Sequence, residues 1–331
     1  MQRTTDHRLL FGSVALLFIG LTVAVAIMPA IDNQGRSAPL PTTSPMTNKE
    51  RLGETVYIAE GCVACHTQQV RAVEMDRPWG GRPGIPADYA HATRQNPWRN
   101  SATLMGTERT GPDLTNIGAR QPSVDWHLLH LYDPRATVPA SIMPSYPWLF
   151  EEKSHAEEND VVVNLPPQLR HGSGVIVATQ QALHLVDYLL SRKQSPLPTG
   201  MPAPDYRLTA RSTEQNRTNA APAVDGQKLY SRYCEACHQA DGKGLPGAFP
   251  PLKRSTTVMG NDIELYTRII IHGVDRMPDY ATMPGVGELN NLSAEEIAAI
   301  INHERTSWGN NAPRISIEKV QQALEAVKEK R

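Results

Sequence analysis

The longest run of apolar positions lies near the N-terminus, where residues 9–31 contain no charged side chain. About 20 apolar residues are enough for a helix to cross a bilayer. A cleaved signal peptide, with "AVA" or "MPA" as its cleavage site, is the alternative, but its apolar region is shorter, so we expect an uncleaved anchor over residues 1–31. Arg3, His7 and Arg8 precede the run and favour a cytoplasmic N-terminus, with the remaining chain outside the cytoplasm.

Polar residues at fixed spacing indicate where two later helices begin. Thr47 with Glu50, and Ser293 with Glu296, each form the T/S-x-x-E pattern of a capping box. The first predicts a helix over "KERLGETVYIAEGC", and the second predicts a helix over "AEEIAAIINHERTSW".

Helical spacing of apolar residues predicts three further helices. The stretch "TQQALHLVDYLLSRK" places five apolar side chains on one broad face, namely Leu183, Leu185, Val186, Leu189 and Leu190. The stretch "VDGQKLYSRYCEACH" predicts a helix that leads into a pair of cysteines, and "SIEKVQQALEAVKEKR" predicts a basic amphipathic helix at the C-terminus.

Two polar segments rich in proline divide the chain. We expect a cytoplasmic end and anchor at 1–31, a linker at 32–47, a first domain at 48–193, a second linker at 194–222, a second domain at 223–313 and a helical tail at 314–331. Residues 151–178 have no clear period and are interpreted as an insertion loop with a short strand pair. We expect the second linker to be flexible, so that the outer domain moves between its partners.

All four cysteines fall into two copies of one motif, C-x-x-C-H. Cys62, Cys65 and His66 form the first copy, and Cys234, Cys237 and His238 form the second. This motif is typical of the attachment of c-type haem, in which two thiols form thioethers with the vinyl groups and the histidine ligates the iron. The sequence therefore predicts two covalently bound haem c groups in a mainly α fold.

Other uses of such cysteine pairs agree less well with the sequence. A thioredoxin-like pair requires a βαβ context, which neither copy has. A shared zinc site requires the two pairs to lie close together, whereas they belong to different predicted domains.

The charge of the chain gives no indication of a nucleic-acid partner, since the net charge is −1 and no basic stripe is present.

A methionine sulfur is the expected sixth ligand of each iron, since histidine–methionine ligation is typical of electron carriers. In the first half Met143, which is followed by proline, is a candidate, and Met75 and Met105 remain open on the residues alone. In the second half we favour Met283 over Met277, because Met283 precedes a capped helix by a few residues.

Two further pairs of residues concern the ligation of the haem irons, one as alternative ligands and the other as hydrogen-bond partners of the ligating histidines. His127 and His130, three apart on a predicted helix, are the strongest alternatives to Met143. Pro112 in "TGPDL" and Pro250 in "FPPL" occupy similar places after their motifs, and each can offer a backbone carbonyl to the second ring nitrogen of its histidine.

The first half resembles subunit II of cbb3-type cytochrome c oxidases, a membrane-anchored subunit with one haem. The resemblance spans residues 1–193 and rests on the apolar anchor, "YIAEGCVACHTQQVR", "RPWGGRPG", "ERTGPDLTNIGAR", "DWHLLHLYDPRATVPASIMPSYPWL" and "ALHLVDYLLSRK". It implies that Met143, in "MPSYPWL", is the axial ligand.

The chain also departs from that family. Ala72 follows Arg71 where the family commonly has proline, and residues 151–178 differ from its pattern. Residues 226–313 are additional and are similar to a class I cytochrome c domain, with "GLPGAFPPL", "MPGVGEL" and "LSAEEIAAIINHERTSWGN" as its marks. The resemblance therefore implies an N-terminal transmembrane helix followed by two class I cytochrome c-like domains.

This architecture implies an electron-transfer subunit in the inner membrane, without catalytic residues of its own. A soluble or membrane-bound cytochrome c-type donor would reduce the haem at His238, the haem at His66 would follow, and a membrane-embedded haem–copper subunit would reduce oxygen. The same role in a nitric oxide reductase, a dihaem cytochrome c peroxidase and an anchored shuttle without a fixed partner are the alternatives.

Overall fold

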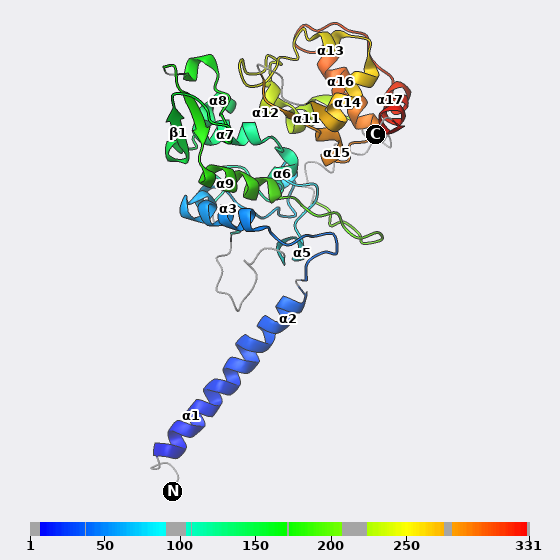
Figure 1. The fold of residues 1–331 in the computed structure, drawn as a ribbon. Helices are drawn as coiled ribbons and strands as arrows, with labels where there is room; N and C mark the ends of the chain where they lie inside the picture. The colour runs from blue at the N-terminus through cyan, green and yellow to red at the C-terminus, as the bar shows by residue number, and fades with distance from the viewer. Residues whose placement is uncertain are drawn as a thin grey trace.

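A computed structural model describes residues 7–36, 38–90, 104–106, 108–170, 172–206, 224–274 and 280–329. The fold is mainly α, as the sequence predicts. One long N-terminal helix extends away from two globular helical parts that lie side by side (Figure 1).

The N-terminal rod is a nearly continuous helix. It consists of α1 (His7–Leu21), a π-helical turn η1 (Thr22–Ile27) and α2 (Met28–Arg36). By length and composition, His7–Asn33 can cross a membrane, and no other helix of the described ranges meets that test. Phe11 and Phe18 are each 70% exposed, as expected of side chains that face lipid. Arg3 lies outside the described residues.

The core of the first part is the helix pair α3 (Asn48–Ala59) and α9 (Gln180–Ser191), which pack closely together. Thr47 and Glu50 form both hydrogen bonds of the predicted capping box. Close packing depends on Gly53, where an added Cβ would lie 1.9 Å from the backbone oxygen of His184. The helices are therefore held at a distance that only glycine permits.

The buried face of α9 differs in part from the predicted one. Leu185, Val186 and Leu189 are buried as expected, whereas Leu183 and Leu190 are only partly buried. Ala182 and Tyr188 complete the face, and the ring of Tyr188 packs 5.3 Å from that of Tyr57. The predicted face did not include Tyr188, whose polar hydroxyl is buried with a partner, since Gln68 donates to it at 2.9 Å.

Short elements connect α3 to α9. They are α4 (Cys62–Cys65), η2 (Glu74–Asp76), α5 (Ala87–Ala90), α6 (Ile117–Arg120), α7 (Val124–Tyr132), α8 (Pro134–Thr137), η4 (Pro147–Leu149), β1 (Phe150–Lys153), η5 (Pro167–Leu169) and β2 (Val175–Ala178). Strands β1 and β2 pair antiparallel, with Phe150 opposite Ala178. The segment 151–178 thus contains the short strand pair that the sequence predicts.

The second part repeats the scheme of a helix, a cysteine motif and a late capped helix. It contains α11 (Gly226–Tyr233), α12 (Glu235–His238), α13 (Thr256–Met259), α14 (Ile263–His272), β3 (Gly273–Val274), β4 (Met283–Pro284), α15 (Val286–Leu289), α16 (Ala294–Thr306) and α17 (Ile317–Glu329). Ser293 and Glu296 form the second predicted capping box. The C-terminal helix α17 packs on α14 and α16 and buries Val320 completely.

The two parts are packed against each other, in contrast to the expected freely moving outer domain. Leu245, Ala248, Phe249 and Ala281 of the second part belong to the hydrophobic cluster of the first. Burial of apolar surface at about 25 cal/mol per Å² favours this contact. Residues 207–222 of the predicted linker lie outside the described residues, but Tyr206 before them is buried and donates to the carbonyl of Gly80 at 3.1 Å.

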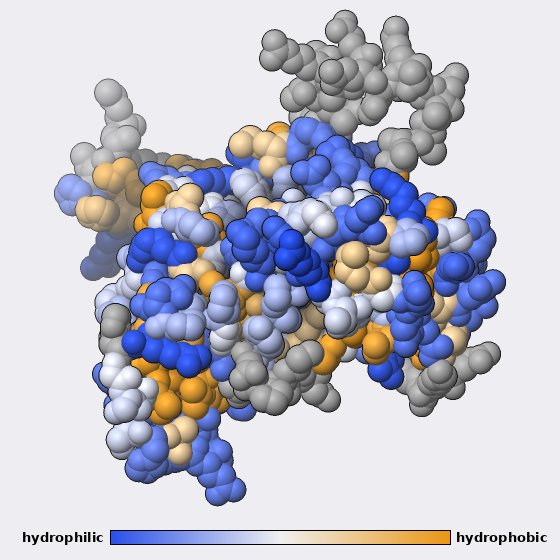
Figure 2. All heavy atoms as spheres, turned by 90° about the horizontal axis from the view of Figure 1, so that it is seen from above, coloured by the Kyte–Doolittle hydropathy of each residue, from blue (hydrophilic) through white to orange (hydrophobic). Residues whose placement is uncertain are grey.

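The surface of the globular parts is largely polar. The face in Figure 2 carries hydrophilic side chains over most of its area, with smaller hydrophobic patches between them. The apolar residues that define the two parts are therefore mostly internal.

Candidate haem sites

The first cysteine motif lies where α3 ends. Gly61 adopts a left-handed conformation with φ +69°, which stops α3 and turns the chain into α4. Cys62 and Cys65 lie on one helical turn, three residues apart, so both thiols share one face. The amide of His66 closes this turn with a hydrogen bond of 3.0 Å to the carbonyl of Cys62.

The imidazole of His66 is oriented by the loop at Pro112. Its Nδ1 donates to the Pro112 carbonyl at 2.8 Å, which leaves Nε2 as the nitrogen for a metal. An added Cβ on Gly111 would lie 2.3 Å from Cε1 of this ring, so glycine makes room for it. Burial lowers the pKa of His66 and favours the neutral imidazole that binds metals.

The second motif has the same arrangement. Nδ1 of His238 donates to the carbonyl of Pro250 at 2.9 Å, and burial lowers the pKa of His238. The chain turns back sharply here, with the amide of Gly244 bonded to the carbonyl of His238 at 3.0 Å. Gly244 has φ +64°, and an added Cβ would lie 2.4 Å from the Pro250 oxygen. Each half of the chain thus contains one hydrogen bond from its motif histidine to a proline carbonyl.

A cavity in the second part brings the predicted residues together. Its wall includes Cys234, Cys237, His238 and Met283. Apolar side chains from α14, α15 and α16 close the remaining sides. Met277 lies outside the described residues. The donor set of two thiols, one imidazole and one thioether around an apolar cavity fits a haem c group.

In the first part Met143 packs against the same hydrophobic cluster as Cys62. Its loop is held by Arg135, which donates to the Met143 carbonyl at 3.1 Å and to the Ser145 hydroxyl at 2.9 Å. Met75 is 64% exposed, and its sulfur accepts a contact from Arg71 at 3.6 Å. Met143 is therefore better enclosed than Met75.

The two histidine rivals each have another partner in the structure. Met105 is half-buried, and the bond that its carbonyl accepts from the amide of Gln68 at 3.1 Å does not involve its sulfur, so Met105 stays open as a ligand. Nε2 of His127 donates to the carbonyl of Gln121 at 2.8 Å, and burial lowers the pKa of His127 to about 4. His130 bonds to the Thr137 hydroxyl at 2.6 Å, and burial lowers its pKa to about 3.

Two of the thiols, those of Cys62 and Cys237, are poorly suited to thiol–disulfide exchange. Burial raises the pKa of Cys62 to about 12, and burial also raises the pKa of Cys237 to about 12. Reactive cysteines have lowered pKa values instead. These raised pKa values argue against a redox disulfide at Cys62 or Cys237.

Three residues that line the cavity of the second part were not predicted from the sequence. Gln121 and Pro122, from the first part, line it, and no local spacing rule relates them to Cys237. Glu304 also lines it, is 3% exposed and accepts a hydrogen bond from the Tyr266 hydroxyl. An acidic residue within the apolar pattern of α16 was the available signal for Glu304.

An apolar N-terminal helix and two cytochrome c-like helical domains define a membrane cytochrome of the c type, which carries covalent haem c. The sequence profile of the family described as cytochrome c oxidase, mono-haem subunit (FixO), matches residues 2–169. The chain therefore belongs to this family. The profile described as cytochrome c oxidase, cbb3-type, subunit III, matches residues 221–303.

Curated relatives are also cytochromes. The cytochrome c subunit of a quinone-dependent alcohol dehydrogenase from Gluconacetobacter polyoxogenes is 33% identical over 154 residues, 43% of this chain and 32% of that protein. A cytochrome c-552 from Thermus thermophilus is 34% identical over 97 residues, 28% of this chain and 65% of that protein. The chain thus spans about a third of the length of the dehydrogenase subunit. Both matched regions of the chain are thus similar to cytochrome c subunits.

Proposed function

We propose that this chain is a dihaem electron-transfer subunit that passes electrons from a cytochrome c-type donor to the catalytic subunit of a cbb3-type terminal oxidase. The repeated hydrogen bond from the motif histidine to a proline carbonyl, at 2.8 Å and 2.9 Å, carries the proposal. Such a contact orients a ligating imidazole, and the chain contains it twice.

In this proposal the thiols of Cys62, Cys65, Cys234 and Cys237 form the thioethers. His66 and Met143 ligate one iron, and His238 and Met283 ligate the other. A bound haem supplies a reversible one-electron couple. The chain itself orients the two imidazoles through Pro112 and Pro250 and excludes water from the cavity.

The partners follow from the family rather than from a contact in this chain. The family profile is that of an oxidase subunit, which supports association with a membrane-embedded haem–copper subunit. The apolar helix supports single-pass insertion into the inner membrane, with a cytoplasmic N-terminus and the haem domains on the outer side. We keep the domain limits expected from the sequence, 48–193 and 223–313, as part of this proposal, and the repeated scheme of elements supports them.

Two measurements test the proposal. The intact mass and the pyridine haemochrome of the purified chain should give two covalent haems per polypeptide, and a value of one or zero contradicts the dihaem assignment. Gentle membrane extraction should then co-purify a haem–copper subunit whose complex consumes oxygen. Consumption of nitric oxide instead, rapid peroxide turnover by the reduced chain alone, or purification without any partner would support one of the alternatives.

A further inference from the structure

The cavity of the second domain is completed by the first domain. Gln121 and Pro122, which follow α6, line it together with Cys234, Cys237 and His238. Oε1 of Gln121 lies 3.8 Å from Sγ of Cys237, and the Gln121 side chain is buried. Once Cys237 is a thioether its S–H is lost, but the amide dipole of Gln121 stays beside the sulfur.

This wall is fixed by a tryptophan that bonds to the second motif itself. Nε1 of Trp126 donates at 3.0 Å to the carbonyl of Ala236, which lies between Cys234 and Cys237. The indole stacks on the ring of His130, with 4.5 Å between ring centroids and 12° between planes. The Thr137 hydroxyl in turn holds His130. A chain of contacts thus connects the first domain to the backbone of α12.

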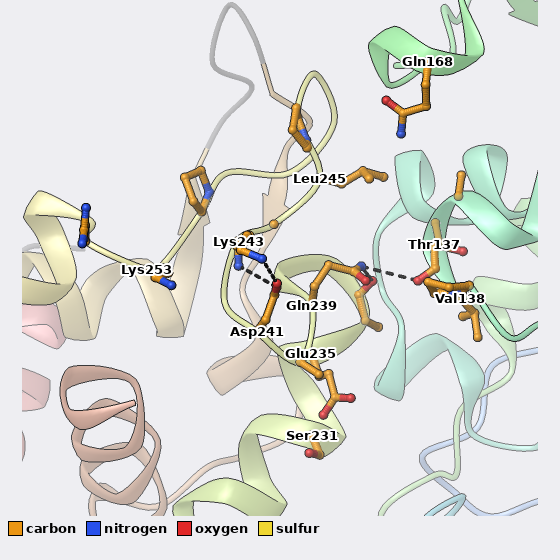
Figure 3. A pocket seen from close by; sticks show the side chains of 18 residues that line it. Thr137, Val138, Gln168, Ser231, Glu235, Gln239, Asp241, Lys243, Leu245 and Lys253 are labelled. Carbon is orange, nitrogen blue, oxygen red and sulfur yellow. Dashed lines mark hydrogen bonds and ion pairs between the residues drawn. The ribbon is translucent and has the colours of Figure 1, made fainter. Parts of the chain in front are cut away.

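Further contacts surround this junction. Nδ2 of Asn290 donates to the carbonyl of Ala119 at 3.1 Å, and Nε2 of Gln239 donates to the carbonyl of Thr137 at 3.4 Å. Figure 3 shows this bond between Gln239 and Thr137, in the wall of a pocket that residues of both domains line. With the shared apolar cluster, these contacts tie the second domain to the first at several points, at the ends of α12 and α15.

We propose that the first domain is a permanent wall of the second haem pocket and that Gln121, a positioning residue, sets the redox potential of the haem bound there. The inference rests on the proposed function, since it requires a haem at each motif. Solvent exclusion and nearby dipoles tune the potential of a haem iron. A residue more than a hundred positions upstream of Cys237 would therefore control the second haem, because the fold places it there.

The experiment compares two substitutions of the same kind in the haem-loaded protein. At a pH above 8, where a buried carboxyl such as that of Glu304 is ionised, Gln121→Glu adds a negative charge beside Cys237, and Gln181→Glu adds the same charge at an exposed position of α9. Spectroelectrochemical titration gives the midpoint potential of each haem, and Met283→His, which changes a proposed ligand, identifies the wave of the second haem. Because negative charge favours the oxidised iron, Gln121→Glu should lower that potential by at least a threefold change in the redox equilibrium, about 28 mV.

A second measurement tests the wall without any redox readout. Trp126→Ala should increase amide hydrogen exchange in α12, whereas Trp148→Ala, at an exposed tryptophan of the same domain, should not. Equal potentials in the two glutamate variants, or unchanged exchange in α12 of Trp126→Ala, would overturn the inference. The haem count is measured first: fewer than two haems contradicts the proposed function, while two haems with no effect of Gln121→Glu contradicts only this inference.

Discussion

The guanidinium of Arg135 donates a hydrogen bond of 3.1 Å to the backbone carbonyl of Met143. The same side chain pairs with Asp133 at 3.4 Å, so it ties the methionine loop to the end of α7. The loop that carries the proposed sulfur ligand is therefore fixed through its backbone, by a contact that does not involve the sulfur.

Removal of this support should loosen the proposed Met143 ligand. In Arg135→Ala we expect a weaker sulfur-to-iron charge-transfer absorption and a lower potential at the first haem, because methionine ligation raises that potential. The variant Arg51→Ala, at an exposed position of α3, is the control. An unchanged spectrum in Arg135→Ala would show that the loop is held by its other contacts.

A side chain at Gly111 should disturb the first site. In Gly111→Ala the new Cβ would meet the ring of His66 at 2.3 Å, so the imidazole must shift away from the Pro112 carbonyl. We expect covalent haem to fall from two groups per chain towards one, measured by intact mass. In the control Gly81→Ala, the nearest atom to the new Cβ lies 4.0 Å away, and both haems should be retained.

The buried carboxylate of Asp76 should support stability at neutral pH. Burial alone would raise the pKa of Asp76, but hydrogen bonds from Arg71 and Arg109 hold it below its ordinary value of 3.8. Its stabilising effect is therefore present above pH 3.8 and is lost as the pH falls below that value. Asp76→Asn should cost roughly 3 kcal/mol of unfolding free energy at pH 7, since the mostly buried guanidinium of Arg109 then loses its nearest carboxylate.

Denaturant unfolding of the haem-loaded protein at pH 7 and at acid pH measures this effect. The difference in unfolding free energy between the wild type and Asp76→Asn should become smaller towards low pH. Asp241→Asn, which removes an exposed partner of Lys243, should change stability by less than about 1 kcal/mol. A similarly small loss in Asp76→Asn at pH 7 would contradict the prediction.

The buried carboxyl of Glu304 should have the opposite pH dependence. Burial raises the pKa of Glu304 from 4.5 to about 7, although the Tyr266 hydroxyl donates a hydrogen bond to it. In the unfolded chain the group ionises near pH 4.5, so the folded state loses stability between pH 4.5 and about 7, by up to about 1.4 kcal/mol per pH unit. Above pH 7 the Glu304 carboxyl is ionised in both the folded and the unfolded chain, so stability no longer falls as the pH rises.

The substitution Glu304→Gln removes this ionisation. Relative to the wild type, Glu304→Gln should therefore gain stability as the pH rises from 5 to 7, measured as the shift in the denaturant midpoint. Glu295→Gln, at an exposed position of the same helix, should show no such trend. A constant difference between Glu304→Gln and the wild type at all pH values would contradict the prediction.

Local spacing was sufficient for much of the fold. Thr47 with Glu50, and Ser293 with Glu296, form the capping boxes that the sequence predicts, because a capping box needs only four consecutive residues. The mainly α fold and the family were also predicted. The assignment of Met143 and Met283 as iron ligands stays a prediction.

Long-range contacts explain what the sequence did not predict. Tyr188 is buried on α9 because Gln68, 120 positions away, bonds to its hydroxyl. The outer domain was expected to move freely because its linker is rich in proline, but that composition carries no information about Phe249 or Trp126 at the interface.

The sequence by itself was enough to predict the chemistry of each half, because the proposed thioether attachment and imidazole ligation depend on residues within one turn of chain, such as Cys62 to His66. Only the tertiary structure decided what surrounds that chemistry. The contacts of Gln121 with Cys237 and of Trp126 with Ala236 join residues more than a hundred positions apart. Such contacts arise from the burial of whole surfaces, and no local period encodes which two surfaces meet.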